Sequence, residues 1–224
     1  SSFADLYQAK VKDKPAPDPH QVKAIEDVTD GLQKSDRGQM IMACGTGKTF
    51  TTLWIKEALK SETTLVLLPS LSLLSQTMRE WAWAGNTDFE ILNVCSDKSV
   101  GKKTEDMAPS DAPFAVTSDV HEISKFLQKS GPRVVFCTYQ SSQLIAEAQI
   151  DTKVPTFDLA IADEAHRCAG KADAGFATIL DGEKIRASKR LFTTATPRYF
   201  GKSIKDASKA ADHAVIGMDD ETVF

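Results

Sequence analysis

Short apolar runs rich in Val, Ile, Leu and Phe recur along the chain, and longer stretches with helical periodicity separate them. A strand buried on both faces forms such a run, whereas a surface helix repeats its apolar residues every third or fourth position. Because the two patterns alternate, the sequence predicts an α/β fold, with right-handed crossovers, a predominantly parallel sheet and helices on both faces. The expected strands are Gln39–Cys44, Thr64–Pro69, Phe89–Cys95, Arg133–Thr138, Leu159–Asp163 and Arg190–Thr194, with Ala214–Met218 as a further candidate. The expected helices are His20–Leu32, Lys48–Lys60, Leu71–Trp83, Val120–Lys129, Ser141–Ala148 and Ala172–Leu180.

Two segments interrupt this alternation. Asp97–Ser118 is rich in Ser, Lys, Asp and Pro and has little periodicity, which is typical of an excursion over the surface. Lys12–Pro19 contains three prolines, which indicate an extended lead-in to the first helix. We therefore expect a lead-in over residues 1–18, one domain over residues 19–218, and the start of a linker over residues 219–224.

The composition is that of a globular protein. The chain has 224 residues, 42% of them hydrophobic, which suits one large α/β domain. No apolar run approaches the roughly 20 residues that cross a bilayer, and no signal-peptide pattern is present, so we expect a cytoplasmic protein without membrane contact. The four cysteines form no CxxC pair, which argues against a zinc site or a disulfide framework. The net charge of -4 argues against binding of nucleic acid by bulk electrostatics.

A phosphate-binding loop is predicted between the first strand and the second helix. The sequence Met-Ala-Cys-Gly-Thr-Gly-Lys-Thr occupies residues 42–49, after an apolar run and at the start of a helical pattern. Gly45 and Gly47, on either side of Thr46, permit backbone conformations in which N–H groups converge on phosphate oxygens. The helix N-terminus adds its positive partial charge, so these residues are expected to bind nucleotide.

Two side chains of the loop supply the remaining chemistry. Lys48 can reach the β- and γ-phosphates of ATP, and the Thr49 hydroxyl can ligate Mg²⁺, which prefers oxygen donors. The strict pattern has glycine at the position of Met42, so the match is incomplete. The alternative is a glycine-rich turn that happens to precede Lys-Thr.

A second motif, which is acidic, follows another apolar run. The run from Phe157 to Ala162 ends in Asp-Glu-Ala-His, and carboxylates at strand ends lie where open α/β sheets bind ligands. Asp163 can hold Mg²⁺ through water, while Glu164 can orient or deprotonate the water that attacks the γ-phosphate. The alternative is a helix N-cap, because Asp and Glu are common before helices. The phosphate loop earlier in the chain favours the ATP-site interpretation, with Lys48, Asp163 and Glu164 as the catalytic set.

These motifs together resemble the N-terminal RecA-like domain of superfamily 2 helicases and translocases. The matching motifs are His20-Gln21, the phosphate loop, Pro69-Ser70-Leu71 with Gln76, Thr138-Tyr139-Gln140-Ser141, the Asp-Glu-Ala-His box, and Thr194-Ala195-Thr196-Pro197. The resemblance covers about residues 19–197 and implies a RecA-like P-loop domain. The sequence looks most like type I and type III restriction-enzyme motor subunits and Swi2-related translocases, and closest to helicase domains of large single-chain restriction-modification proteins.

The resemblance also implies roles for residues outside the ATP motifs. His166, Thr194 and Thr196 would couple nucleotide state to domain position, and Gln21 would read adenine. Ordinary β-propensity is the alternative for the two threonines. Helix surface is the alternative for Gln21, since Asp18 stands where many relatives have arginine.

A further set of residues would lie near the nucleic-acid backbone. This set is Ser70, Thr138 and Gln140. Turn or cap chemistry is the alternative, because Ser and Thr favour such sites in any protein.

The implied activity is ATP- and Mg²⁺-dependent translocation on double-stranded DNA within a restriction-modification or related defence enzyme. Such motors need a second RecA-like domain with an arginine finger, so we expect residues 1–224 alone to be poorly active. Nuclease or methyltransferase domains or subunits are further expected partners. The alternatives are an RNA helicase domain and a catalytically silent nucleotide-binding interaction module.

Overall fold

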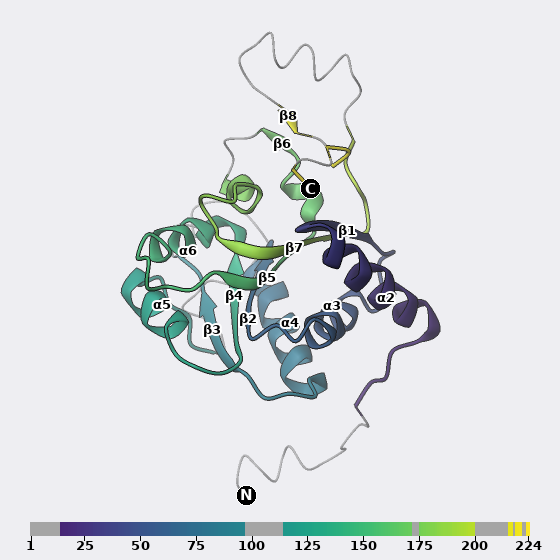
Figure 1. Ribbon diagram of the computed structural model, residues 1–224, viewed down its shortest axis with the longest axis horizontal. Coiled ribbons are helices and arrows are strands. Elements are labelled where there is room, and N and C mark those ends of the chain that lie inside the picture. The colour runs from purple at the N-terminus through teal and green to yellow at the C-terminus, as the bar shows by residue number, and fades with distance from the viewer. Residues whose placement is uncertain (1–13, 97–113, 172–174, 200–214, 217, 221–222) are drawn as a thin grey trace, which may run out of the picture.

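The computed structural model describes residues 14–96, 114–171, 175–199, 215–216, 218–220 and 223–224 (Figure 1). The strands are β1 (Arg37–Ile41), β2 (Thr63–Leu68), β3 (Glu90–Val94), β4 (Arg133–Thr138), β5 (Phe157–Asp163), β6 (Gly170–Lys171), β7 (Ala187–Thr194) and β8 (Val215–Ile216). The α-helices are α2 (Pro19–Lys34), α3 (Lys48–Ala58), α4 (Leu71–Ala84), α5 (Val120–Leu127) and α6 (Ser142–Ala148). Short 3₁₀ helices are η3 (Tyr139–Ser141), η4 (Ala165–Arg167) and η5 (Gly175–Leu180).

Six of these strands form one parallel sheet in the order β1-β7-β5-β2-β4-β3. Every residue of β2 and β4 is buried, as expected of parallel strands covered on both faces. The predicted α/β class and predominantly parallel sheet are therefore confirmed.

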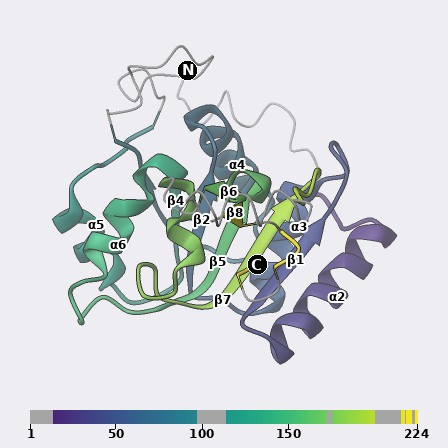
Figure 2. The same ribbon diagram turned by 90° about the horizontal axis from the view of Figure 1, so that it is seen from above.

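Helices cover both faces of this sheet (Figures 1 and 2). On one face, α2, α3 and α4 bury an apolar cluster that includes Leu53, Leu74 and Trp81. On the other face, α5, α6 and η5 bury a second cluster that includes Phe126 and Ile145. These two cores hold the sheet rigid, and its carboxyl edge carries the candidate site.

Several predicted elements differ from those observed. The first strand ends at Ile41 rather than at residue 44, because the chain turns there into the glycine loop. The helix predicted over residues 172–180 is the 3₁₀ helix η5, and residues 172–174 lie outside the described residues. The last predicted strand is only β8, which pairs antiparallel with β6 in a separate two-stranded sheet rather than extending the main one.

The structure describes only parts of the predicted lead-in, surface excursion and linker. Residues 1–13 and 97–113 lie outside the described residues, but Thr117 forms a parallel bridge with Val94 at the end of β3. At the carboxyl end, the rings of Phe224 and Phe192 lie 5.0 Å apart, and Phe224 is 4% exposed. The described part of residues 219–224 thus contacts the core, and its role as the start of a linker stays a prediction.

Candidate functional site

The loop between β1 and α3 has the backbone that phosphate binding requires. Gly45 and Gly47 have φ of +78° and +79°, in the left-handed region that favours glycine. Gly47 is the N-cap of α3, so the helix begins at Lys48, directly after the loop. The N-terminus of α3 therefore faces the loop and offers unpaired N–H groups to an anion.

Gln21 ties α2 to this loop. Its side chain is only 5% exposed, and its Nε2 donates to the carbonyl oxygens of Thr46 at 3.1 Å and Gly47 at 3.3 Å. Its Oε1 accepts from the Asp18 N–H at 2.8 Å. Gln21 is therefore not simple helix surface, and its contact with adenine stays a prediction.

Lys48 joins the loop to the acidic motif. Its Nζ lies 2.8 Å from Glu164 Oε1 and 3.3 Å from Asp163 Oδ1. Burial alone would lower the pKa of Lys48, but the attraction of Asp163 and Glu164 and its hydrogen bonds to them outweigh burial and raise that pKa. Lys48 is therefore a fully charged ammonium group placed between both carboxylates.

Asp163 and Glu164 follow each other at the carboxyl end of β5. Asp163 Oδ1 accepts from Thr193 Oγ1 at 2.8 Å, because the register of β5 and β7 places these two residues side by side. Glu164 has φ 51° and ψ 44°, a left-handed conformation that costs a residue other than glycine about 1–2 kcal/mol. Glu164 occupies the N-cap position of η4, as the alternative expected, but its side chain makes no cap hydrogen bond there. Its carboxylate points instead to the charged groups of the site.

His166 connects Glu164 to the end of β7. Its Nδ1 lies 2.9 Å from Thr194 Oγ1 and 3.3 Å from Glu164 Oε2. The Thr194 hydroxyl also accepts from the N–H of Thr196 at 3.1 Å. Burial, together with Arg167 and other nearby cations, lowers the pKa of His166, although Glu164 opposes this shift. The three residues predicted to couple nucleotide state to domain movement are thus connected by hydrogen bonds.

The residues predicted to contact nucleic acid lie at the same edge of the sheet, at or just after the carboxyl ends of β2 and β4. Ser70 is the N-cap of α4, and its Oγ accepts from the Leu73 N–H at 3.2 Å. Thr138 is buried, and its Oγ1 donates to Ser141 Oγ at 3.0 Å. Gln140 is exposed. Cap and turn chemistry therefore describes what the two hydroxyls do here, and nucleic-acid contact by the three residues stays a prediction.

Three residues outside the predicted set hold the site in place. The Trp81 indole N–H donates to the Thr49 carbonyl at 3.0 Å, and the Tyr139 hydroxyl donates to the Asp163 carbonyl at 2.6 Å. Thr193 bonds Asp163, as described above. All three contacts join segments that are distant in sequence, so local motifs did not reveal them. Tyr139 belongs to the motif Thr138-Tyr139-Gln140-Ser141, but the sequence did not reveal its contact with Asp163.

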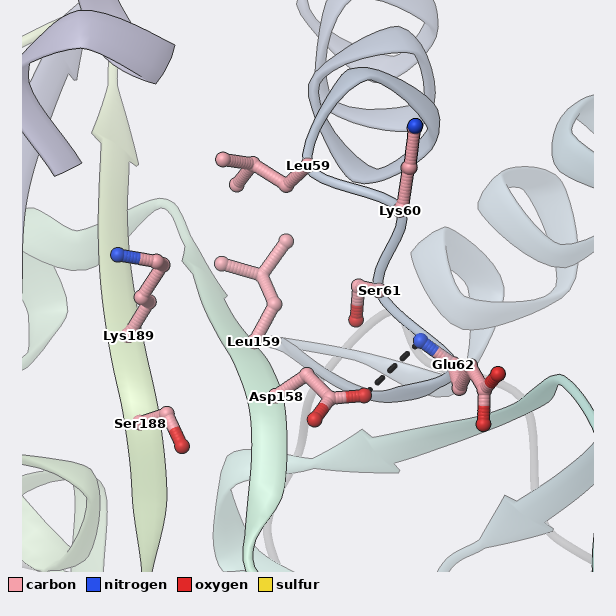
Figure 3. Close-up of a pocket in the computed structure, with 8 residues that line it drawn as sticks. All are labelled: Leu59, Lys60, Ser61, Glu62, Asp158, Leu159, Ser188 and Lys189. Carbon is pink, nitrogen blue, oxygen red and sulfur yellow. Dashed lines mark hydrogen bonds between the residues drawn. The ribbon is translucent and has the colours of Figure 1, made fainter. Parts of the chain in front are cut away.

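One cavity lies away from this chemistry. A hollow of about 380 Å³ opens at the amino ends of β2, β5 and β7, where Asp158 Oδ2 accepts from the Glu62 N–H at 2.9 Å (Figure 3). A second hollow of about 310 Å³ adjoins the phosphate loop and is lined by His20, Ala43 and Thr46, among others. The second hollow is beside the ATP motifs and is the relevant one.

Two features are absent from the described part of the chain. No cluster of three or more His, Cys, Asp or Glu residues that could hold a metal ion occurs among the described residues. In the same part of the chain, no helix is both long and apolar enough to cross a bilayer.

The fold and the site together define the N-terminal RecA-like domain of a superfamily 2 helicase. Residues 14–199 match the family of the type III restriction enzyme res subunit, and this chain belongs to that family. It is also similar to a probable helicase, A859L, of African swine fever virus, with 36% identity over 169 residues that cover 75% of this chain and 18% of the viral protein.

Two solved structures extend this comparison. The ATP-dependent Type ISP restriction-modification enzyme LlaBIII bound to DNA is 34% identical, with a TM-score of 0.78 over 99% of this chain and 15% of that one. A nuclease-deletion mutant of the Type ISP enzyme LlaGI in complex with a DNA substrate mimic is 32% identical, with a TM-score of 0.71 over 93% of this chain and 19% of that one. The predicted likeness to restriction-enzyme motors is confirmed, and the chain spans less than a fifth of each relative.

Proposed function

We propose that this domain binds Mg-ATP and couples its hydrolysis to movement along double-stranded DNA, as part of a restriction-modification or related defence enzyme. The observation that carries the proposal is the approach of Lys48 to both Asp163 and Glu164, at 3.3 Å and 2.8 Å, beside a left-handed glycine loop. A chance Lys-Thr after a turn has no reason to meet two carboxylates on another strand.

Binding of ATP would rearrange this cluster. The β- and γ-phosphates compete with Asp163 and Glu164 for Lys48, and the N–H groups at the start of α3 add fixed donors. Gln21 already holds the carbonyls of Thr46 and Gly47, so it fixes the shape of the loop before nucleotide arrives. We propose that adenine binds in the hollow beside the loop, which His20 and Thr46 line.

The residues present fit a magnesium ion held jointly with phosphate. Thr49 supplies a hydroxyl and Asp163 a carboxylate, and no larger cluster of His, Cys, Asp and Glu occurs in the described residues. Mg²⁺ keeps several waters and usually takes only one or two protein oxygens beside substrate phosphates. When bound, the ion would neutralise charge on the phosphate oxygens.

Glu164 is the proposed base. Once Lys48 turns to phosphate, the Glu164 carboxylate is free to orient or deprotonate water, while the Thr193 hydroxyl keeps Asp163 in place. His166 contacts both Glu164 and Thr194. A movement of the Glu164 carboxylate can therefore shift the segment after β7 through His166. A second RecA-like domain with an arginine finger, worth about 10³–10⁵ in rate in comparable systems, would complete the site.

DNA is the proposed track because one Type ISP neighbour is described as bound to DNA and the other as in complex with a DNA substrate mimic. The double-stranded form is proposed from the resemblance of the motifs to restriction-enzyme motors and Swi2-related translocases. The test is the ATPase rate of the intact protein with duplex DNA, single-stranded DNA or RNA, together with displacement of a triplex-forming strand as a measure of movement. We expect duplex DNA to stimulate hydrolysis and strand displacement to need ATP. Stimulation by RNA alone would favour an RNA helicase, and an unchanged ATPase after Glu164→Gln would overturn the enzymatic proposal.

A further inference from the structure

Tyr139 links the predicted nucleic-acid turn to the catalytic carboxylates. It is the first residue of η3, it is fully buried at 0% exposure, and its hydroxyl donates to the carbonyl oxygen of Asp163 at 2.6 Å. Strand β2 lies between β4, which precedes Tyr139, and β5, which ends at Asp163 (Figure 2). The side chain therefore reaches past a neighbouring strand to the one that carries the acidic motif.

The position of the acceptor gives this hydrogen bond its consequence. The Asp163 carbonyl belongs to the peptide group that joins Asp163 to Glu164. Rotation of this peptide changes ψ of Asp163 and φ of Glu164, and the φ of Glu164 is 51°, a strained value that surrounding contacts must enforce. By fixing this carbonyl, Tyr139 helps to set where the Glu164 carboxylate points.

The other side of Tyr139 is tied to the turn. Gln140, the next residue, is exposed at the carboxyl edge of the sheet. Thr138, the preceding one, donates to Ser141 Oγ at 3.0 Å, and Ser141 Oγ accepts from the Ser96 N–H at 2.8 Å. These bonds make η3 a compact unit. Binding of nucleic acid at Gln140 would therefore displace Tyr139 together with the turn.

We propose that Tyr139 is a positioning residue that transmits engagement of nucleic acid at the Thr138–Ser141 turn to the Glu164 carboxylate, and so makes ATP hydrolysis depend on nucleic acid. This inference rests on the proposed function, because it requires a motor whose ATPase is stimulated by nucleic acid. It adds a specific route for that stimulation through the peptide between Asp163 and Glu164. Tyr139 touches no phosphate in this scheme and acts only through that peptide.

The first test uses Tyr139→Phe in the intact protein. This change removes only the hydroxyl and keeps the ring that fills the core. We expect the ratio of DNA-stimulated to unstimulated kcat to fall about tenfold, because the variant loses the buried hydrogen bond to the Asp163 carbonyl together with the contact of the hydroxyl with Cys168. The KM for ATP and the Kd for DNA should stay within about twofold of the wild type, because no binding group is lost.

Ser61→Ala is the matched control. Ser61 is also buried, at 5% exposure, and its hydroxyl forms a 2.8 Å hydrogen bond with Thr64 Oγ1, but it lies beside the cavity at the opposite edge of the sheet (Figure 3). The Ser61→Ala variant should leave the ratio of DNA-stimulated to unstimulated kcat unchanged. An equal fall of the stimulated and unstimulated rates in Tyr139→Phe, or no fall in either, would overturn the inference. A wild-type protein that no nucleic acid stimulates would instead overturn the proposed function.

A second measurement does not depend on the variant folding. Hydrogen–deuterium exchange of wild-type protein, with and without duplex DNA and without nucleotide, should show a DNA-dependent change in the peptide that contains Asp163 to Arg167. Tyr139→Phe, where folded, should lose this change. DNA that alters exchange around Gln140 and leaves residues 163–167 unaffected would contradict the proposed link.

Discussion

The Lys48 ammonium group lies 2.8 Å from Glu164 Oε1, so the residue that is expected to bind phosphate is paired with the residue that is expected to activate water. Both side chains are largely buried, with 14% and 25% of their surfaces exposed. Phosphate must displace this carboxylate to reach Lys48. The same contact therefore occupies one carboxylate oxygen of Glu164 until phosphate replaces it.

This pairing predicts that Glu164→Gln separates binding from hydrolysis. The amide keeps the shape of the side chain but removes the charge that competes with phosphate for Lys48. We expect ATP affinity to be equal to or tighter than wild type, whereas turnover falls by about 10²–10⁴, the usual contribution of a general base. A fluorescent ATP analogue and a phosphate-release assay measure the two quantities. Lys48→Ala is the contrasting variant, since it should lose affinity, and equally weak binding by both variants would argue against the competition.

The two loop glycines predict different costs of adding a methyl group. Gly45 and Gly47 share the left-handed conformation, so alanine at either position costs about 1–2 kcal/mol of stability. A Cβ at Gly47 would also lie 2.2 Å from Gln21 Nε2, whereas a Cβ at Gly45 would meet nothing within 4 Å. Gly47→Ala must therefore displace Gln21 Nε2 and its two hydrogen bonds, which adds about 1–3 kcal/mol. Urea unfolding of both variants measures the difference.

Gln21→Ala supplies the control for this comparison. With the amide removed, Gly47→Ala and Gly45→Ala should destabilise the protein by similar amounts. A difference that persists in the Gln21→Ala background would show that the cost at Gly47 has another source.

The sheet could be predicted because each central strand is a continuous apolar run. Arg133–Thr138 was predicted residue for residue as β4, and α4 was predicted to within one residue. The strand β8 lies within the predicted run Ala214–Met218, but its pairing was not predicted because its partner, β6, has only two residues and no apolar pattern. The 3₁₀ form of η5 depends on packing rather than on periodicity, so the sequence gives no signal that distinguishes it from an α-helix.

The site was predictable as far as its chemistry is local in sequence. The phosphate loop and the acidic motif each carry their function in a few consecutive residues. The bonds that organise them are not local, since Trp81 holds the Thr49 carbonyl from another helix and Thr193 holds Asp163 from the neighbouring strand. Such contacts depend on strand order and register, which spacing along the chain does not specify.

Cys44 provides a chemical probe of the loop. It is exposed within the loop, whereas Cys95, Cys137 and Cys168 are buried, and burial raises the pKa of Cys168 to about 12. A thiol reagent should therefore modify Cys44 first, because reaction needs an accessible thiolate. Mg-ATP should slow this reaction by at least about tenfold by covering the loop. Mass spectrometry of the labelled peptides gives the rates, and labelling of Cys44 that is unaffected by saturating Mg-ATP would contradict nucleotide binding at this loop.

His166 predicts a specific pH dependence of stability. Burial lowers the pKa of the native side chain below its ordinary value of 6.5, and Glu164 partly opposes this effect. As the pH falls through 6.5, the unfolded chain takes up the proton before the native protein does. The protein therefore loses stability between pH 6.5 and the native pKa of His166, and this residue causes no further loss at lower pH. The free energy of unfolding, measured with urea from pH 7.5 to 5, should therefore fall less steeply in His166→Asn than in wild type. NMR titration should find the His166 pKa lower still in Glu164→Gln, since the opposing charge is gone. A wild-type pKa at or above 6.5 would contradict this prediction, because it would show that the attraction of Glu164 outweighs burial.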